Sequence, residues 1–135
     1  MANLNETLHE LRQAYVTESS DDLGGLARLI GEIESRPSAT TLDHIQRRFL
    51  GLAGSGYTYG FPLVSTLGRR GEKLCGALLR TEDLVSPSVL IACRAVVSDL
   101  RAEFDRLQAT YAQGPWVTRG PQPRPSSFLG WARHA

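Results

Sequence analysis

The sequence predicts an all-α protein, an antiparallel up-down-up-down four-helix bundle with an additional N-terminal helix. Apolar side chains recur at steps of three and four residues over most of residues 4–111, which is the period of an amphipathic helix. The alternation expected of a half-buried strand occurs nowhere in the sequence. The connections between the apolar stripes are short, and short connections favour antiparallel neighbours. A length of 135 residues predicts one domain.

Composition excludes several classes of protein. A formal net charge of +1, with 41% hydrophobic and 21% charged residues, is not typical of a nucleic-acid-binding or a disordered chain. The apolar runs are far shorter than the ~20 residues of a membrane span, and the polar start carries no signal-peptide core, so a cytoplasmic protein is expected. Cys75 and Cys93 are isolated and no histidines cluster, so we expect buried thiols and neither a metal nor another cofactor.

The first apolar stripe runs through Leu4, Leu8, Leu11 and Tyr15, and continues after the polar residues 18–22. This pattern predicts two consecutive helices, or one bent helix, before Pro37. The continuing positions are Leu23, Leu26, Ile30 and Ile33.

Three further helices follow. Thr40 and Asp43 resemble a capping box that opens the next helix, and Gly60 is expected to end it in a left-handed conformation. Pro62 suits the first turn of the following helix, and Ser86-Pro87 begins the last one, which Gly114-Pro115 ends. The inward faces are expected to be, in turn, Leu42, Ile45, Phe49, Leu52 and Gly56; Leu63, Leu67, Gly71, Leu74 and Leu78; and Val89, Cys93, Val96, Leu100, Phe104, Leu107 and Tyr111.

Residues 114–135 differ in composition from the bundle, which we assign to residues 1–113. This tail has four prolines, three arginines, no acidic residue and both tryptophans of the chain. Segments of this kind dock into grooves of partner proteins, remain disordered, or lie back over their own domain. A tail that lay back near the helix that begins at Thr40 would mask a docking face on the bundle.

The stretch FLGLAGSGYTYGFP, residues 49–62, places four glycines where periodicity predicts a helix and a turn. On a helical wheel Leu50 lies on the polar side, and Gly54, one turn later, leaves the space around it open. A helical glycine costs about 1 kcal/mol relative to alanine, so close approach of a partner would explain it. Alternatively, the glycines permit tight helix packing or fraying. The residues that share the arc with Leu50 are Asp43, Gln46, Arg47, Gly54 and Tyr57.

This stretch resembles the signature of histidine-containing phosphotransfer (Hpt) domains. In that signature a histidine is followed by any residue, an apolar residue, a lysine or small residue, glycine and a small residue, and an aromatic-glycine-aromatic turn then leads into the next helix. The matching residues are Leu52, Ala53, Gly54, Ser55 and Gly56, then Tyr59, Gly60, Phe61 and Pro62. The resemblance implies a four-helix bundle that exchanges phosphoryl groups with receiver-domain aspartates in two-component phosphorelays.

The position of the phosphorylated histidine, four residues before Gly54, is occupied by Leu50. An aliphatic side chain offers no nucleophile, so the resemblance implies the docking surface without the reaction. His44 lies on the same expected helix, about 120° around it and about 9 Å along it, and would not face the same partner. His9 and His134 belong to the first helix and the tail.

Three functions remain open. The first is a pseudo-phosphotransfer protein, not an enzyme, that docks a receiver domain or a histidine kinase; its oligomeric state is left open, with a monomer favoured. The second is an active phosphotransfer protein that uses a displaced histidine such as His44. The third is a helical scaffold that presents its tail to a partner. An imidazole beside Leu50 would distinguish the second from the first.

Overall fold

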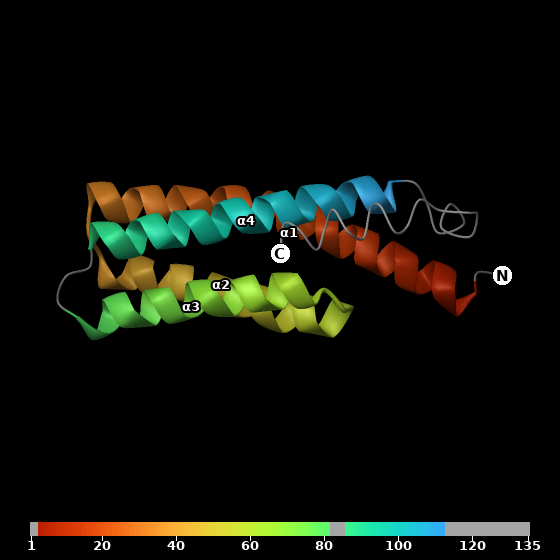
Figure 1. The fold of residues 1–135 in the computed structure, drawn as a ribbon, viewed down its shortest axis with the longest axis horizontal. Coiled ribbons are helices and arrows are strands. Elements are labelled where there is room, and N and C mark those ends of the chain that lie inside the picture. The colour runs from red at the N-terminus through yellow and green to blue at the C-terminus, as the bar shows by residue number, and fades with distance from the viewer. Residues whose placement is uncertain (1–2, 82–85, 113–135) are drawn as a thin grey trace.

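The computed structural model describes residues 3–81 and 86–112, which form four helices (Figure 1). The helices are α1 (Leu4–Ser35), α2 (Ala39–Tyr59), α3 (Pro62–Arg80) and α4 (Pro87–Tyr111). These ranges contain no strand, which confirms the predicted all-helical fold class. None of the four helices has the length and hydropathy needed to span a bilayer. The predicted tail, residues 114–135, and its Gly114-Pro115 boundary lie outside the described residues.

α1 is one helix of 32 residues, where the sequence predicted two helices or one bent one. Its N-cap is Asn3, whose side-chain oxygen accepts a hydrogen bond from the Glu6 amide at 2.8 Å. The polar residues 18–22 do not interrupt it, because Ser19 is buried while Glu18, Asp21 and Asp22 keep their carboxylates exposed to solvent. The additional N-terminal helix is therefore not a separate element. Instead, the first turns of α1 extend beyond the ends of α2 and α3 (Figure 1).

Each helix packs mainly against two others, so the four surround one core. α1 lies against α4 and α2, and α3 lies against α2 and α4, with the most extensive contact between α2 and α3. In Figure 1 this gives one pair, α1 with α4, above a second pair, α2 with α3. The largest fully buried side chains come from all four helices: Leu23, Leu26, Ile30, Ile33, Leu42, Ile45, Phe49, Val64, Leu78, Leu100 and Phe104.

The ends of α2 are fixed by local hydrogen bonds. Ser38 is its N-cap and accepts a hydrogen bond from the Thr41 amide at 3.2 Å, so the predicted capping box of Thr40 and Asp43 is wrong. At the other end Gly60 has φ of +84°, as predicted for a left-handed terminus. The Phe61 amide donates to the Gly56 carbonyl at 2.7 Å, which completes a Schellman motif before Pro62 starts α3.

Glycines bring α2 and α3 into backbone contact. A β-carbon on Gly68 would lie 2.6 Å from the amide nitrogen of Ala53 and 2.8 Å from the carbonyl oxygen of Phe49. A β-carbon on Gly71 would lie 2.4 Å from the ring of Phe49, and one on Gly56 would lie 2.9 Å from Val64. These positions admit no side chain without displacement of the neighbouring helix. The packing alternative proposed from sequence therefore holds for Gly56.

The expected inward faces are largely confirmed. All five positions predicted for α2 are buried. On α3 the buried stripe is rotated slightly, so that Leu63 and Leu74 are half-buried while Val64 and Cys75 occupy the core. On α4 only Val89 and Tyr111 at the ends remain half-buried. The first three leucines of α1, by contrast, are exposed on the extension: Leu4, Leu8 and Leu11.

Candidate protein-docking site

The outer face of α2 carries an exposed apolar centre, and we use the name "α2 face" for Asp43, Arg47, Leu50, Gly54 and Tyr57. Leu50 is 53% exposed although it is apolar, and Tyr57 is 77% exposed although it carries a large aromatic ring. No atom lies within 4 Å of the place where a β-carbon on Gly54 would be. The predicted exposure of Leu50 and the open space at Gly54 are confirmed.

Charged side chains border this centre on its N-terminal side. The Arg47 guanidinium lies 2.9 Å from the Asp43 carboxylate, one helical turn apart, and this ion pair is in contact with solvent. An exposed pair of this kind adds only about 0.3–0.5 kcal/mol to stability, so it remains available to a partner.

The helical wheel also placed Gln46 on the same side of the helix as Leu50, but its side chain forms hydrogen bonds with α3. Its side-chain nitrogen donates to the backbone carbonyl of Glu72 at 3.4 Å and to the Glu72 carboxylate at 3.3 Å. Both acceptors belong to α3, so the amide points away from the α2 face. A helical wheel cannot reveal this, because it contains no neighbouring helix.

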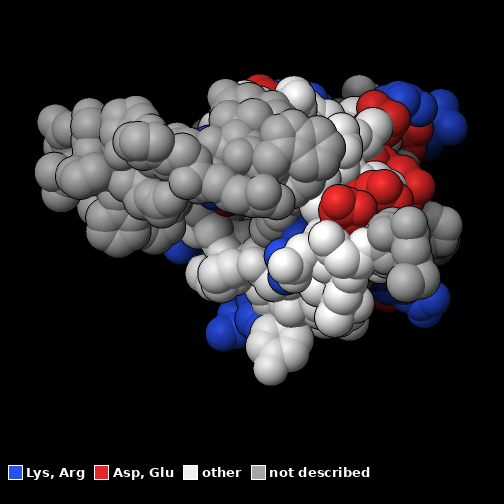
Figure 2. Space-filling model, turned by 90° about the vertical axis from the view of Figure 1, so that its right-hand side faces the viewer, with Lys and Arg blue, Asp and Glu red and all other residues white. Residues whose placement is uncertain are grey.

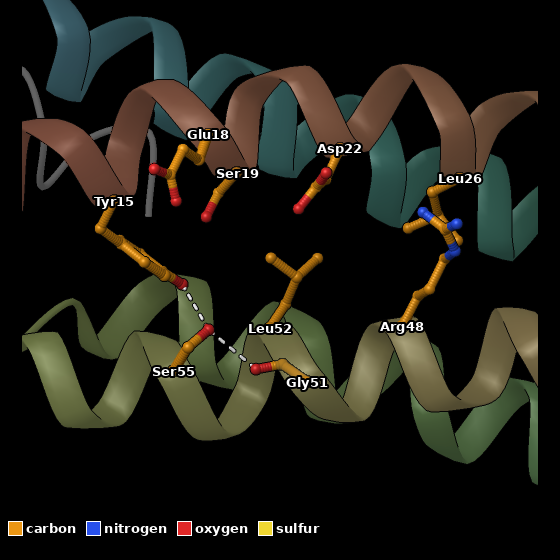
Figure 3. Close-up of a pocket in the computed structure, with 9 residues that line it drawn as sticks. All are labelled: Tyr15, Glu18, Ser19, Asp22, Leu26, Arg48, Gly51, Leu52 and Ser55. Carbon is orange, nitrogen blue, oxygen red and sulfur yellow. Dashed lines mark hydrogen bonds between the residues drawn. The ribbon is translucent and has the colours of Figure 1, made fainter.

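A pocket of about 340 Å³ lies between α1 and α2, directly beside the α2 face (Figure 3). Gly51 and Ser55, the helical neighbours of Leu50 and Gly54, form its near wall. Glu18, Ser19 and Asp22 point into it from α1, and Arg48 crosses from α2 toward Leu26 (Figure 3). The remaining lining residues are Tyr15 and Leu52. The sequence did not predict this pocket, because it depends on the pairing of two helices, although three residues of the polar run 18–22 line it.

Hydrogen bonds close one end of the pocket. The Ser55 hydroxyl donates to the Gly51 carbonyl at 2.8 Å, and the Tyr15 hydroxyl lies 2.8 Å from the same Ser55 oxygen (Figure 3). Because the Ser55 proton is already used, Tyr15 is the donor in this pair. At the other end, a β-carbon on Gly25 would lie 3.3 Å from Nη1 of Arg48, so the guanidinium rests against the α1 backbone.

The aromatic-glycine-aromatic turn of the family motif serves the fold. Phe61 is buried, and its ring stacks on Tyr15 with centroids 5.8 Å apart, while the Tyr59 ring stacks on Tyr15 at 4.5 Å. The Tyr59 carbonyl accepts a hydrogen bond from Nε of Arg12 at 3.0 Å, which satisfies an orphan acceptor at the end of α2. Of the motif residues, Leu50, Gly54 and Ser55 therefore face solvent or the pocket, whereas Gly60 and Phe61 hold the α2–α3 connection.

No histidine of the described ranges belongs to the α2 face or lines the pocket. His44 is exposed on α2, about 120° around the helix from Leu50. His9 packs its ring against Tyr111 of α4, with centroids 4.9 Å apart. His134 lies outside the described residues.

The cysteines are buried in the core, as predicted. The hydrogen bond to Cys93, together with burial, raises the pKa of the Cys75 thiol well above its ordinary value, so this thiol stays protonated at neutral pH. Within residues 3–81 and 86–112, no group of three or more potential ligands could hold a metal ion. The α2 face offers exposed apolar surface and an ion pair, and the pocket offers carboxylates, hydroxyl groups and one guanidinium.

Comparison of this chain with protein-family models, with curated proteins and with solved structures found no match.

Proposed function

We propose that this protein is a pseudo-histidine-phosphotransfer protein that docks a receiver domain or a histidine kinase through the α2 face and regulates two-component signalling without carrying phosphate. In this proposal the four helices form an antiparallel up-down-up-down bundle, and the extension of α1 takes the place of a separate N-terminal helix. The protein acts in the cytoplasm, where those partners present their catalytic domains.

One observation carries the proposal: Leu50, at the position of the phospho-accepting histidine in the family pattern, is 53% exposed beside the open space at Gly54. The fold of its own chain leaves about half of this leucine in contact with water. A partner that covers it removes apolar surface from water, which contributes about 25 cal/mol per Å².

The surroundings of Leu50 support a protein partner. An apolar centre with a polar rim is the usual anatomy of a protein interface, and here Asp43, Arg47 and Tyr57 supply the rim. The pocket extends this surface toward α1, because Gly51 and Ser55 belong to its wall and adjoin Leu50 and Gly54. A partner centred on Leu50 would therefore contact two helices rather than one.

Replacement of Leu50 by aspartate tests the proposal. Since Leu50 is exposed, the change should cost less than about 1 kcal/mol in the free energy of unfolding. Binding should weaken by about 2 kcal/mol or more, roughly 30-fold in Kd, as expected for a central interface residue. Thermal denaturation and calorimetric titration against purified receiver domains and histidine-kinase domains of the source organism measure both quantities.

Ile91→Asp is the matched control, because Ile91 is 68% exposed and lies at the start of α4, away from the α2 face. It should leave the affinity unchanged. Gly54→Gln should reproduce the weakening by filling the open space beside Leu50. Equal affinity for the wild type, Leu50→Asp and Gly54→Gln, in folded proteins, would refute docking through the α2 face.

Phosphoryl transfer should be absent. Incubation with phosphorylated receiver domains or an active kinase is expected to leave the protein unlabelled, since Leu50 provides no nucleophile. Leu50→His is the gain-of-function control and should restore weak labelling at most. Acid-labile phosphate on His44 of the wild type would instead establish the alternative of an active phosphotransfer protein.

A further inference from the structure

The extension of α1 exposes a stripe of leucines that the bundle does not cover. Leu4, Leu8 and Leu11 follow steps of four and three residues, which places them on one side of the helix. We call them the leucine stripe; they are 72%, 38% and 49% exposed. Three of the six large hydrophobic side chains exposed in the described residues thus fall within eight positions. Such a concentration of apolar surface marks an interaction site.

Acidic side chains lie among the leucines of the stripe and farther along α1. Glu6 and Glu10 fall within the stripe, Glu18, Asp21 and Asp22 follow about two turns or more later, and the one basic residue of residues 4–22 is Arg12. Arg12 already donates to the carbonyl at the end of α2. Figure 2 looks onto the end of the molecule where α1 begins, and acidic side chains gather on one flank of this surface. A ligand of the leucine stripe should therefore combine large apolar groups with positive charge.

The chain itself contains such a ligand in residues 113–135. This segment carries Arg119, Arg124 and Arg133 without any acidic residue, and its large apolar side chains are Trp116, Phe128, Leu129 and Trp131. The segment also begins close to the leucine stripe. Tyr111, which is two residues before the segment, packs its ring on His9, and His9 follows Leu8 in the sequence. The leucine stripe is only about 10 Å long, whereas 23 residues reach up to about 75 Å.

We propose that residues 113–135 dock on the leucine stripe of their own chain, with aromatic side chains against the leucines and arginines facing the acidic residues of α1. This contact is separate from the α2 face and does not depend on the proposed phosphorelay function. It removes the exposed apolar surface of α1 from water without a second protein.

The tryptophans allow a direct test in the full-length protein, because the sequence has two and both lie in residues 113–135. Intrinsic tryptophan fluorescence therefore reports on this segment alone. The wild type should emit at a shorter wavelength, and be quenched less by acrylamide, than the urea-unfolded chain. Leu8→Asp should shift emission and quenching toward the values of the unfolded chain while the helical circular dichroism is retained.

Ile91→Asp is again the matched control, since it places the same charge at an exposed apolar position about 30 Å along α4 from Tyr111. It should leave the fluorescence unchanged. If Leu8→Asp loses helicity, Leu4→Asp at the most exposed position of the leucine stripe decides the question. Wild-type emission equal to that of the unfolded chain, or no response to the stripe variants, overturns the proposal. Emission that changes on dilution also overturns it, by assigning the leucine stripe to a second copy of the chain.

Discussion

Phe49→Ala is expected to lower the free energy of unfolding by about 3–5 kcal/mol, the largest effect of any single substitution considered for this fold. Phe49 is 0% exposed, and its ring lies over Gly71 of α3. The space left by the ring would be bordered by Gly71, which has no side chain that could move into it. The cavity would therefore persist, and its cost adds to the lost burial of the ring. Urea denaturation followed by circular dichroism measures the change.

Tyr57→Ala is the matched control, because it also removes an aromatic ring from α2, at a position that is 77% exposed. Its effect on the free energy of unfolding should stay within about 0.5 kcal/mol. A loss below about 1 kcal/mol for Phe49→Ala would contradict the packing of α2 on α3 described above.

Gly68→Ala should destabilise the protein by about 1–3 kcal/mol, although alanine is the better helix former. The added methyl group would lie 2.6 Å from one backbone atom of α2 and 2.8 Å from another, and backbone atoms cannot rotate aside. Accommodation requires α2 and α3 to separate, and this loosens the contacts on both sides of the glycine. The midpoint of urea denaturation reports the result.

Gly54→Ala provides the comparison, because the same change is made in a helix interior where no atom lies within 4 Å. There the gain in helix propensity should stabilise the protein by up to about 1 kcal/mol. If both variants were stabilised, the close approach of α3 to α2 would be incorrect.

Much of the fold could be predicted from periodicity. The inward face of α2 and most of that of α4 follow from steps of three and four residues, since a helix buries one side whatever covers it. The left-handed Gly60 and the start of α3 at Pro62 depend on intrinsic backbone preferences, and these act locally. The sequence left open whether residues 4–35 form two helices or one bent helix, because a polar run can mark either a break or the exposed side of a continuous helix. In α1 the buried residue of that run is Ser19, which is small enough to be buried.

The features of the candidate site that depend on α2 alone could be predicted from the sequence, and those that depend on a neighbouring helix could not. The exposure of Leu50 follows from its angle on the wheel, but the orientation of Gln46 depends on Glu72 of a different helix. Gly54 and Gly56 illustrate the same difference between features that one helix determines and features that depend on a second helix. Gly54 faces open space and Gly56 faces Val64, and the sequence alone could not assign these two roles because they depend on the path of α3. The pocket could not be predicted either, because it depends on the pairing of α2 with α1.

The close contact of α2 with α3 also affects the energetics of recognition at the α2 face. Where Gly68 brings the α3 backbone against Ala53 and Phe49, the close backbone packing opposes a shift or rotation of α2 against α3. In the proposed docking, the backbone that carries Leu50 and Gly54 is therefore ordered before a partner arrives. Association then has to restrict only a few side chains, so the entropic penalty of ordering this surface is small and more of the contact energy appears as affinity.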